Sequence, residues 1–233
     1  MVRDDGDWLQ DGVLESSAVV ANNAMNRQRG LDGVNSYARE LGFHPLDLLT
    51  TRLAATASGT VAWLDLCCGT GRALIQAADR LYTERDRVRL VGVDLVDFFD
   101  PVPEAVPALE LVCAPALSWE PAHRFDLITC VHGLHYIGDK LTLLTRAASW
   151  LTDDGLLVAD LDLSSIRLAG GKPAGDRLAT ALRGAGFSLD RRRRQIRRTG
   201  RGTVTLPYTY LGADDRAGPN YTGQPAVHSY YAR

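Results

Sequence analysis

The 233-residue sequence lacks several features that would place it at a membrane or in a secretory route. Its N-terminus has no apolar signal core, and no stretch approaches the roughly 20 apolar residues that a membrane span needs. The formal net charge is only −2, so no strong overall field attracts the protein to nucleic acid or to a membrane. We therefore expect a cytoplasmic protein without a membrane partner.

Cysteine is scarce, and its spacing excludes a common kind of metal site. The four cysteines form no Cys-x-x-Cys pair and have no matching histidine spacing, so a structural zinc site is not expected. All four lie in apolar segments, where buried and reduced thiols are the usual outcome. A chain of this length, with 45% apolar residues, can build its core without disulfides or metal.

From residue 60 onward, short apolar runs alternate with helical patterns. Such alternation indicates an α/β fold with a parallel, doubly wound sheet. The predicted strands span residues 61–67, 88–94, 109–113, 125–131 and 156–163. The predicted helices span residues 72–85, 140–151 and 176–184, with a turn at 153–155.

Two flanking regions complete the predicted fold. Residues 1 to about 13 look like a mobile leader, and the pattern from 15 to about 53 is helical, so residues 1–58 are expected to form an N-terminal helical cap. Residues 59–233 then form the α/β domain. Candidate strands at 188–198, 203–211 and 226–231 make its end β-rich, with their pairing open. The expected fold class is a seven-stranded, mostly parallel, doubly wound sheet.

The strongest signal for a binding site is the segment Asp65-Leu-Cys-Cys-Gly-Thr-Gly71, which follows the first strand and opens a helix. Glycines there let the backbone pass close under a ligand. The position is the carboxyl edge of the sheet, where open α/β folds bind ligands. Asp94 ends the second strand, where a carboxylate can accept both ribose hydroxyls of an adenosine group. Several nucleoside cofactors share that geometry.

Two residues favour S-adenosylmethionine over NAD. A dinucleotide site has a third small residue three positions after the second glycine, to close helix and strand around a pyrophosphate. That position is Leu74, which is too bulky. Asp65 would repel a pyrophosphate but attract the ammonium group of methionine.

Five segments, in this order, resemble the class I S-adenosylmethionine-dependent methyltransferase superfamily over roughly residues 60 to 190. The resemblance implies a Rossmann-like fold, S-adenosylmethionine as cofactor and methyl transfer as the reaction. The matching segments are 65–71, Asp94, 125–128 with 133–136, 151–156 and 182–187.

The resemblance also implies which residues hold the cofactor. Asp65, Gly69 and Gly71 would hold the methionine part, Asp94 the ribose, and Leu95 one face of the adenine. The sequence departs from the family pattern twice, since Cys67 replaces the first glycine and Ala114-Pro115 replaces a frequent aspartate. The full set of predicted cofactor-binding residues is Asp65, Cys67, Gly69, Thr70, Gly71, Asp94, Leu95, Ala114, Pro115 and Val131.

Residues for the second substrate come from three places. His132 and His135 follow the fourth strand, where one of them could act as a general base, and the alternative for His135 is a structural packing role. The polar segment before the sheet and the loop at 214–223 could face the same pocket, and the alternative for the segment is helix capping and a solvated surface. The predicted catalytic residues are His132, His135 and Tyr37, and the predicted substrate-binding residues are Asn35, Arg39 and Tyr221.

One basic cluster spans Arg191–Arg194 and continues with Arg197, Arg198 and Arg201. Such charge binds phosphate, which makes RNA a conceivable partner. The alternative is an edge strand whose charges prevent sheet-to-sheet aggregation. Because the whole chain is slightly acidic, we do not expect nucleic acid as a partner.

The predicted function is transfer of a methyl group to O or N of a small molecule or short peptide, mainly by positioning. No metal is expected, since no acidic cluster resembles the metal site of catechol-type relatives. Two alternatives stay open: a protein that binds the cofactor but catalyses a non-methylating rearrangement, and a non-catalytic binding subunit. A homodimer also stays open.

Overall fold

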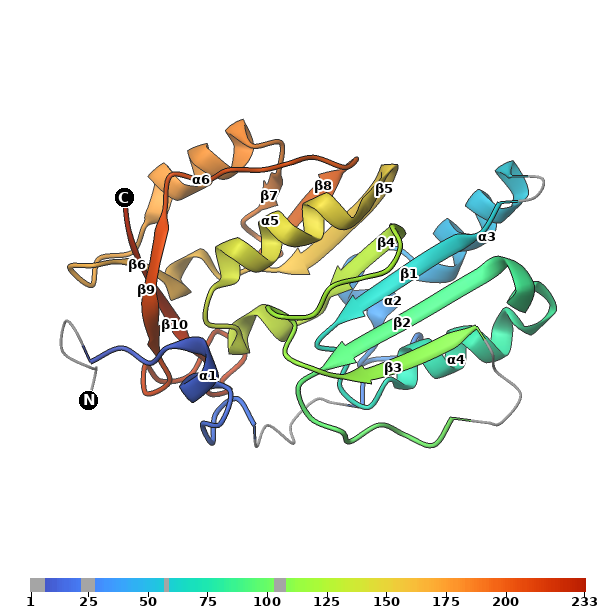
Figure 1. Cartoon of the computed structure of the whole chain (residues 1–233), viewed down its shortest axis with the longest axis horizontal. Coiled ribbons are helices and arrows are strands. Elements are labelled where there is room, and N and C mark those ends of the chain that lie inside the picture. Colours follow the sequence, from blue (N-terminus) through green and yellow to red (C-terminus); the bar gives the residue numbers. More distant parts are fainter. Residues whose placement is uncertain (1–6, 22–27, 57–58, 103–107) are drawn as a thin grey trace.

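A seven-stranded sheet forms the centre of the computed structural model, which describes residues 7–21, 28–56, 59–102 and 108–233 (Figure 1). The strand order is β3-β2-β1-β4-β5-β8-β7. The first five strands pair in parallel, and β8 runs antiparallel to both of its neighbours, which confirms the predicted fold class. The strands are β1 (Val61–Leu66), β2 (Val88–Asp94), β3 (Leu109–Cys113), β4 (Phe125–Cys130), β5 (Leu151–Asp160), β7 (Ser188–Asp190) and β8 (Gln195–Thr199).

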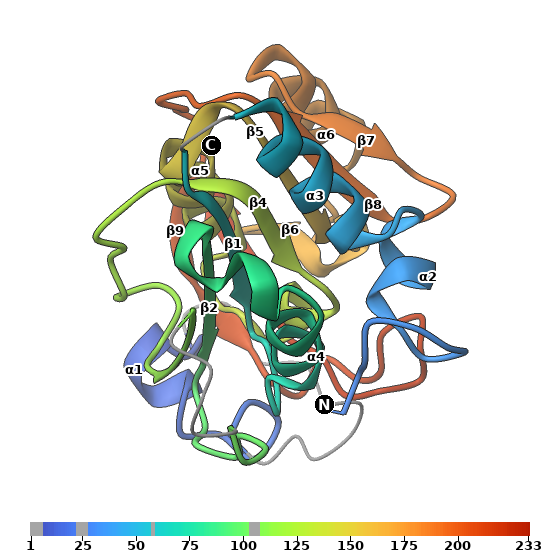
Figure 2. The same ribbon diagram turned by 90° about the vertical axis from the view of Figure 1, so that its right-hand side faces the viewer.

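Helices cover both faces of this sheet, and α3 and α4 lie toward the viewer in Figure 2. Alternate residues of β1 show the two layers, because Trp63 packs with α3 (Pro45–Ala55) and α4 (Arg72–Arg80), whereas Leu64 packs with α5 (Lys140–Trp150) and α6 (Gly175–Gly184). Successive side chains of a strand point to opposite faces, so a strand with both faces covered reads as a continuous apolar run.

A second, three-stranded sheet lies beside the first and has the order β6-β10-β9 (Figure 1). It consists of β6 (Ile166–Leu168), β9 (Thr209–Asp214) and β10 (His228–Ala232). The predicted mobile leader is wrong for residues 8–13. Leu9 exchanges backbone hydrogen bonds with Ala213 of β9, Trp8 stacks on Tyr230 of β10 at 4.5 Å, and α1 (Asp11–Leu14) follows.

The C-terminal strands differ from the prediction. Residues 188–198 form a hairpin rather than one strand, because Asp190 accepts the N–H groups of Arg192 and Arg193 and reverses the chain before β8. Residues 203–208 lie outside any strand, and β9 begins only at Thr209. β9 and β10 join the second sheet, to which the unpredicted β6 contributes the third strand.

Several strand and helix ends also differ from the prediction. The expected turn at 153–155 is an irregular part of β5, where the pairing jumps from Phe125–Leu151 to Leu127–Leu156, and β5 ends at Asp160 rather than at 163. The helix from residue 72 ends at Arg80 and continues as the 3-10 helix η1 (Tyr82–Arg87).

The predicted helical cap is largely not regular helix. Residues 15–21 form turns, residues 22–27 lie outside the described residues, and α2 (Tyr37–Leu41) precedes α3. The proposed division of the chain at residue 58 stays a prediction. Within the described ranges, no helix combines the length and apolarity required to cross a membrane.

Candidate cofactor and acceptor site

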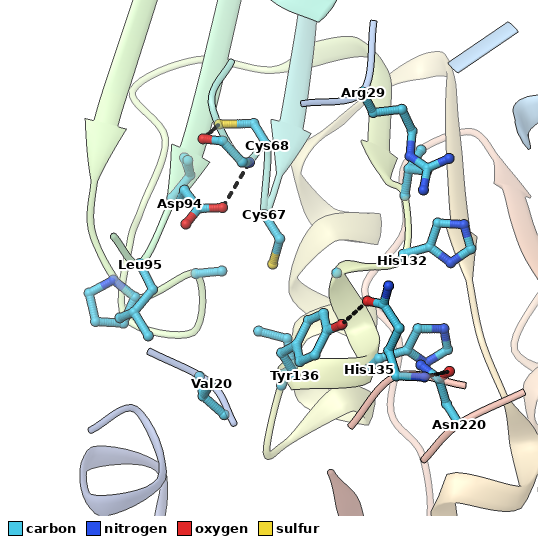
Figure 3. Close-up of a pocket in the computed structure, with 18 of the residues that line it drawn as sticks. Val20, Arg29, Cys67, Cys68, Asp94, Leu95, His132, His135, Tyr136 and Asn220 are labelled. Carbon is cyan, nitrogen blue, oxygen red and sulfur yellow. Dashed lines mark hydrogen bonds between the residues drawn. The ribbon is translucent and has the colours of Figure 1, made fainter. Parts of the chain in front are cut away.

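The carboxyl ends of β1, β2 and β4 open onto a cavity of about 380 Å³ (Figure 3). This volume lies in the range of small-molecule and cofactor sites, and the sheet edge is where α/β folds place them. Residues before β1, the 3-10 helix η2 (Gly133–Tyr136) and the loop around residues 220–224 complete its walls. The predicted residues that line it are Asn35, Tyr37, Cys67, Gly69, Asp94, Leu95, Pro115, Val131, His132, His135 and Tyr221.

The remaining predicted residues do not form the wall. Asp65, Thr70, Gly71 and Ala114 are not among the lining residues, whereas Ala116 and Leu117 are. Arg39 is exposed and donates to the carbonyl of Val34 at 3.0 Å, so the side chain of α2 that reaches the cavity beside Tyr37 is Glu40.

The glycine turn after β1 holds Asp94 in place. Gly69 and Gly71 have φ angles of 62° and 73°, in the left-handed region that favours glycine. The N–H of Gly69 donates to Asp94 Oδ2 at 2.8 Å, and the N–H of Val96 donates to Oδ1 at 3.1 Å. Each carboxylate oxygen can accept more than one hydrogen bond, so the Asp94 carboxylate at the cavity wall can still bind hydroxyl groups.

Asp65 has a different environment from the one that the resemblance implied. Its two oxygens accept hydrogen bonds from the hydroxyls of Tyr37 at 2.5 Å and Thr129 at 2.6 Å, and Trp63 Nε1 donates to Thr129 at 2.8 Å. Burial raises the pKa of Asp65 to about 7. Asp65 is 1% exposed, links α2 to β1 and β4 through these hydrogen bonds, and is not among the residues that line the cavity.

Backbone strain gathers around the cavity. In the described part of the chain, the non-glycine residues with positive φ are Cys67 (59°), His132 (58°) and Arg194 (51°). The first two line the cavity, where Figure 3 shows Cys67 projecting inward. A Cβ on Gly133 would lie 2.4 Å from Cys67 Cβ, so glycine is needed there. Strained residues of this kind cluster at functional sites.

His132 lies between two carboxylates. Its Nε2 is 3.3 Å from Glu40 Oε2, and its Nδ1 is 3.8 Å from Asp160 Oδ2, which also accepts the His132 backbone N–H at 2.9 Å. The hydrogen bond from His132 lowers the pKa of Glu40, whose other oxygen pairs with Arg29 at 2.8 Å. Among the described residues, Glu40, His132 and Asp160 have ligand atoms close enough to share a metal ion, all within 4.8 Å of one another.

His135 is the second histidine of the wall. It is 1% exposed, and its Nε2 has no hydrogen-bond partner in the described part of the chain. Burial lowers the pKa of His135 to about 3, so the ring is neutral near pH 7. The Tyr221 ring lies 5.3 Å away, edge-on.

The C-terminal loop reaches the cavity through specific contacts. Tyr136 of η2 donates its hydroxyl proton to Gln224 Oε1 at 3.2 Å, as Figure 3 shows. The guanidinium of Arg194 lies 3.9 Å from the centre of the Tyr221 ring. The hairpin turn between β7 and β8 therefore meets this loop beside the cavity.

Much of the predicted basic cluster is engaged within the chain. Arg191 pairs with Asp176, Arg197 donates to the carbonyl of Leu41 at 2.5 Å, and Arg201 lies 3.3 Å from Asp153. Such contacts give these arginines structural partners. That nucleic acid is not a partner of this protein nevertheless stays a prediction.

Sequence reasoning missed five charged residues at or beside the cavity: Asp11, Glu15, Arg29, Glu40 and Asp160. Asp160 ends β5, but the predicted strand continued to residue 163, so the rule that selected Asp94 did not mark Asp160. The other four lie before the sheet, where no local pattern marks them as facing a pocket. Tertiary packing alone brings them there.

The model of the family described as "Methyltransferase domain" matches residues 37–198, well over half of the chain, and the chain belongs to this family. The recognition as a class I methyltransferase is thereby confirmed, and S-adenosylmethionine is the cofactor of the class. The sequence has no match among curated proteins.

Solved structures provide further likenesses. An amino pentose methyltransferase from Micromonospora echinaspora is 20% identical, with 49% of this chain and 48% of that chain covered and a TM-score of 0.37. The N-methyltransferase NodS from Bradyrhizobium japonicum WM9 is 16% identical, with 82% and 97% covered and a TM-score of 0.43. The cyclase SpnF is 19% identical, with 68% and 60% covered and a TM-score of 0.42. The chain thus spans about half the length of the first of these.

Proposed function

We propose that this protein is an S-adenosylmethionine-dependent methyltransferase that methylates O or N of a small molecule or short peptide. One observation carries the proposal: the glycine turn and the Asp94 carboxylate meet on the wall of a cavity that extends to polar side chains of η2 and the C-terminal loop. Such a cavity can hold a nucleoside cofactor and an acceptor side by side.

The wall offers a partner for each part of the cofactor. Asp94 would accept the ribose hydroxyls, and Leu95 and Pro115 would contact the adenine. The backbone at Cys67 and Gly69 would lie along the methionine part. When bound, S-adenosylmethionine supplies a methyl group on a positively charged sulfur, already activated for attack by a nucleophile.

Arg29 and Glu40 suit the charged end of the methionine part. The Arg29 guanidinium would bind the carboxylate of the methionine part, and Glu40 would bind its ammonium group. Each of these two side chains would then have an opposite charge beside it, as it has in the present Arg29–Glu40 pair. Arg29 is 8% exposed, so water competes little for these contacts. Asp65, whose oxygens are occupied by two hydroxyls, would order this region.

Catalysis would come mainly from alignment and exclusion of water. The pairing of His132 Nε2 with Glu40 suits a positioning role, although Nδ1 of the same ring has no hydrogen-bond partner among the described residues. His135 keeps its unpartnered Nε2 at the cavity wall, where it can form a hydrogen bond with the acceptor. The Tyr37 hydroxyl donates a hydrogen bond to Asp65, so Tyr37 would hold α2 in place rather than act on the substrate.

Activity is expected to survive complete removal of divalent metal. The methyl group on the positively charged sulfur is already activated, so its transfer by alignment needs no Lewis acid. The check is methyl transfer measured before and after treatment with EDTA and gel filtration. Activity that disappears and returns with added Mg²⁺ or Zn²⁺ would make Glu40, His132 and Asp160 a metal site.

The proposal itself is tested by calorimetric titration of the folded protein with S-adenosylmethionine and S-adenosylhomocysteine, with NAD as control. We expect micromolar binding of the first two and none of NAD. Mass spectrometry of acceptors incubated with S-adenosylmethionine should then show the increment of one methyl group. A product of unchanged mass would indicate a rearrangement, and absence of cofactor binding would indicate a binding subunit.

A further inference from the structure

The cavity carries unequal charge. Its acidic lining residues are Asp11, Glu15, Glu40 and Asp94, and the basic one among the described residues is Arg29. Arg29 and Glu40 pair with each other, and Asp94 accepts backbone N–H groups at the glycine turn. Asp11, Glu15 and Asp94 therefore have no basic side chain of the described lining to balance their charge, and of these three only Asp94 is held by two backbone N–H groups.

Asp11 and Glu15 stand one helical turn apart, at the start of α1 and at its C-terminal cap, so they face the same side. Both are partly buried, and burial raises the pKa of each carboxyl group, with a further rise for Glu15 from the charge of Asp11. Asp11 accepts a hydrogen bond from the neutral Tyr210 hydroxyl at 3.0 Å. A cation beside both would offset their desolvation and their mutual repulsion.

Lys140 is the base whose charge lowers the pKa of Asp11, but its ammonium group already has hydrogen-bond partners. Its Nζ donates to two backbone carbonyls, each at 2.9 Å, and to the Ser229 hydroxyl at 2.6 Å. Burial lowers the pKa of Lys140 to about 7, and Asp139 adds a further negative charge near Asp11. This part of the cavity therefore favours an external cation.

A second and independent feature points to a ligand that forms hydrogen bonds. The unpartnered Nε2 belongs to His135, which is almost fully buried and lines the same cavity. Figure 3 places its ring beside Asn220, away from Asp94. A neutral imidazole has one nitrogen that accepts a hydrogen bond, and an N–H group of a ligand can supply it.

We propose that the acceptor substrate is an organic amine that enters as its ammonium ion and is held by Asp11 and Glu15. This inference rests on the proposed methyltransferase function and names its substrate class. In the reaction the ammonium ion first releases one proton to Glu15, which passes it to solvent. The nitrogen lone pair then forms a bond to the methyl carbon, the carbon–sulfur bond breaks, and its electron pair stays on sulfur. The products are the methylated ammonium ion and neutral S-adenosylhomocysteine.

The test uses the full chain and matched amines and alcohols that carry the same benzyl, phenethyl, indolylethyl or octyl group. Each compound is titrated calorimetrically with and without saturating S-adenosylhomocysteine, whose own binding is measured first. At least one amine should bind about tenfold more tightly than its alcohol, because only the amine forms charge-assisted hydrogen bonds with carboxylates. With S-adenosylmethionine, the same amine should gain the mass of one methyl group.

Variants identify the residues responsible. Glu15→Gln and Asp11→Asn should each remove most of the preference for the amine, whereas Glu110→Gln, at an exposed position on β3, should leave it unchanged. The inference is overturned if no amine binds, if the alcohols bind equally well, or if the preference survives the double variant. Absence of S-adenosylhomocysteine binding in the first titration would instead overturn the proposed function, so the two failures are distinguishable.

Discussion

Replacement of Asp94 by alanine is expected to weaken the binding of S-adenosylhomocysteine about 100-fold. The ribose hydroxyls would lose a charged acceptor, and each hydrogen bond to a charged group is worth about 1.5–3 kcal/mol. The turn would also loosen, since the Gly69 and Val96 N–H groups lose their partner. Calorimetric titration of the purified variant measures the effect.

Two further variants separate binding from folding. Asp94→Asn keeps an acceptor oxygen and should show an intermediate affinity. Asp97→Ala removes an exposed acid three residues along the chain and should bind as the wild type does. Wild-type affinity in a folded Asp94→Ala variant would contradict the role of Asp94 at the ribose.

Replacement of Tyr37 by phenylalanine is expected to destabilise the protein more at alkaline than at acidic pH. The Tyr37 hydroxyl donates to Asp65, whose pKa burial raises to about 7. The pKa of Asp65 is higher in the folded than in the unfolded protein. The stabilisation that the protonated Asp65 carboxyl contributes is therefore complete below the unfolded-state pKa and is lost as the pH rises through about 7. Loss of the donor disfavours the ionised form, so the pKa of Asp65 should rise further in the variant and the loss should extend to higher pH.

The expected loss of unfolding free energy is about 1 kcal/mol near pH 5 and about 3 kcal/mol near pH 9, because an ionised buried acceptor suffers more from a missing donor than a protonated one. Urea denaturation followed by tryptophan fluorescence at both pH values measures it. Tyr82→Phe, at an exposed tyrosine, is the matched control and should change neither value. Equal losses at the two pH values would show that Asp65 does not titrate in this range.

An element could be predicted from the sequence where it depends on local interactions, and was missed where it does not. The ends of β1, β2, β3 and β4 were predicted to within one residue, and the predicted fifth strand overlaps β5 over residues 156–160. These strands were found because an apolar run between turns is a local property. The hairpin of β7 and β8 was missed, because the Asp190 side chain accepts the N–H groups of Arg192 and Arg193 and reverses the chain inside an otherwise strand-like segment. The unpredicted β6 is only three residues long, too short for any periodicity.

The amino-acid sequence by itself determined the fold class, the family and the position of the glycine turn with Asp94, since each depends on local motifs and on their order along the chain. Only the tertiary structure decided what surrounds them. It directed Asp65 to Tyr37 and Thr129, and it brought Glu40, His132 and Asp160 together from segments up to 120 residues apart. Spacing along the chain does not encode such long-range contacts, because they depend on how α2 packs at the carboxyl edge of the sheet.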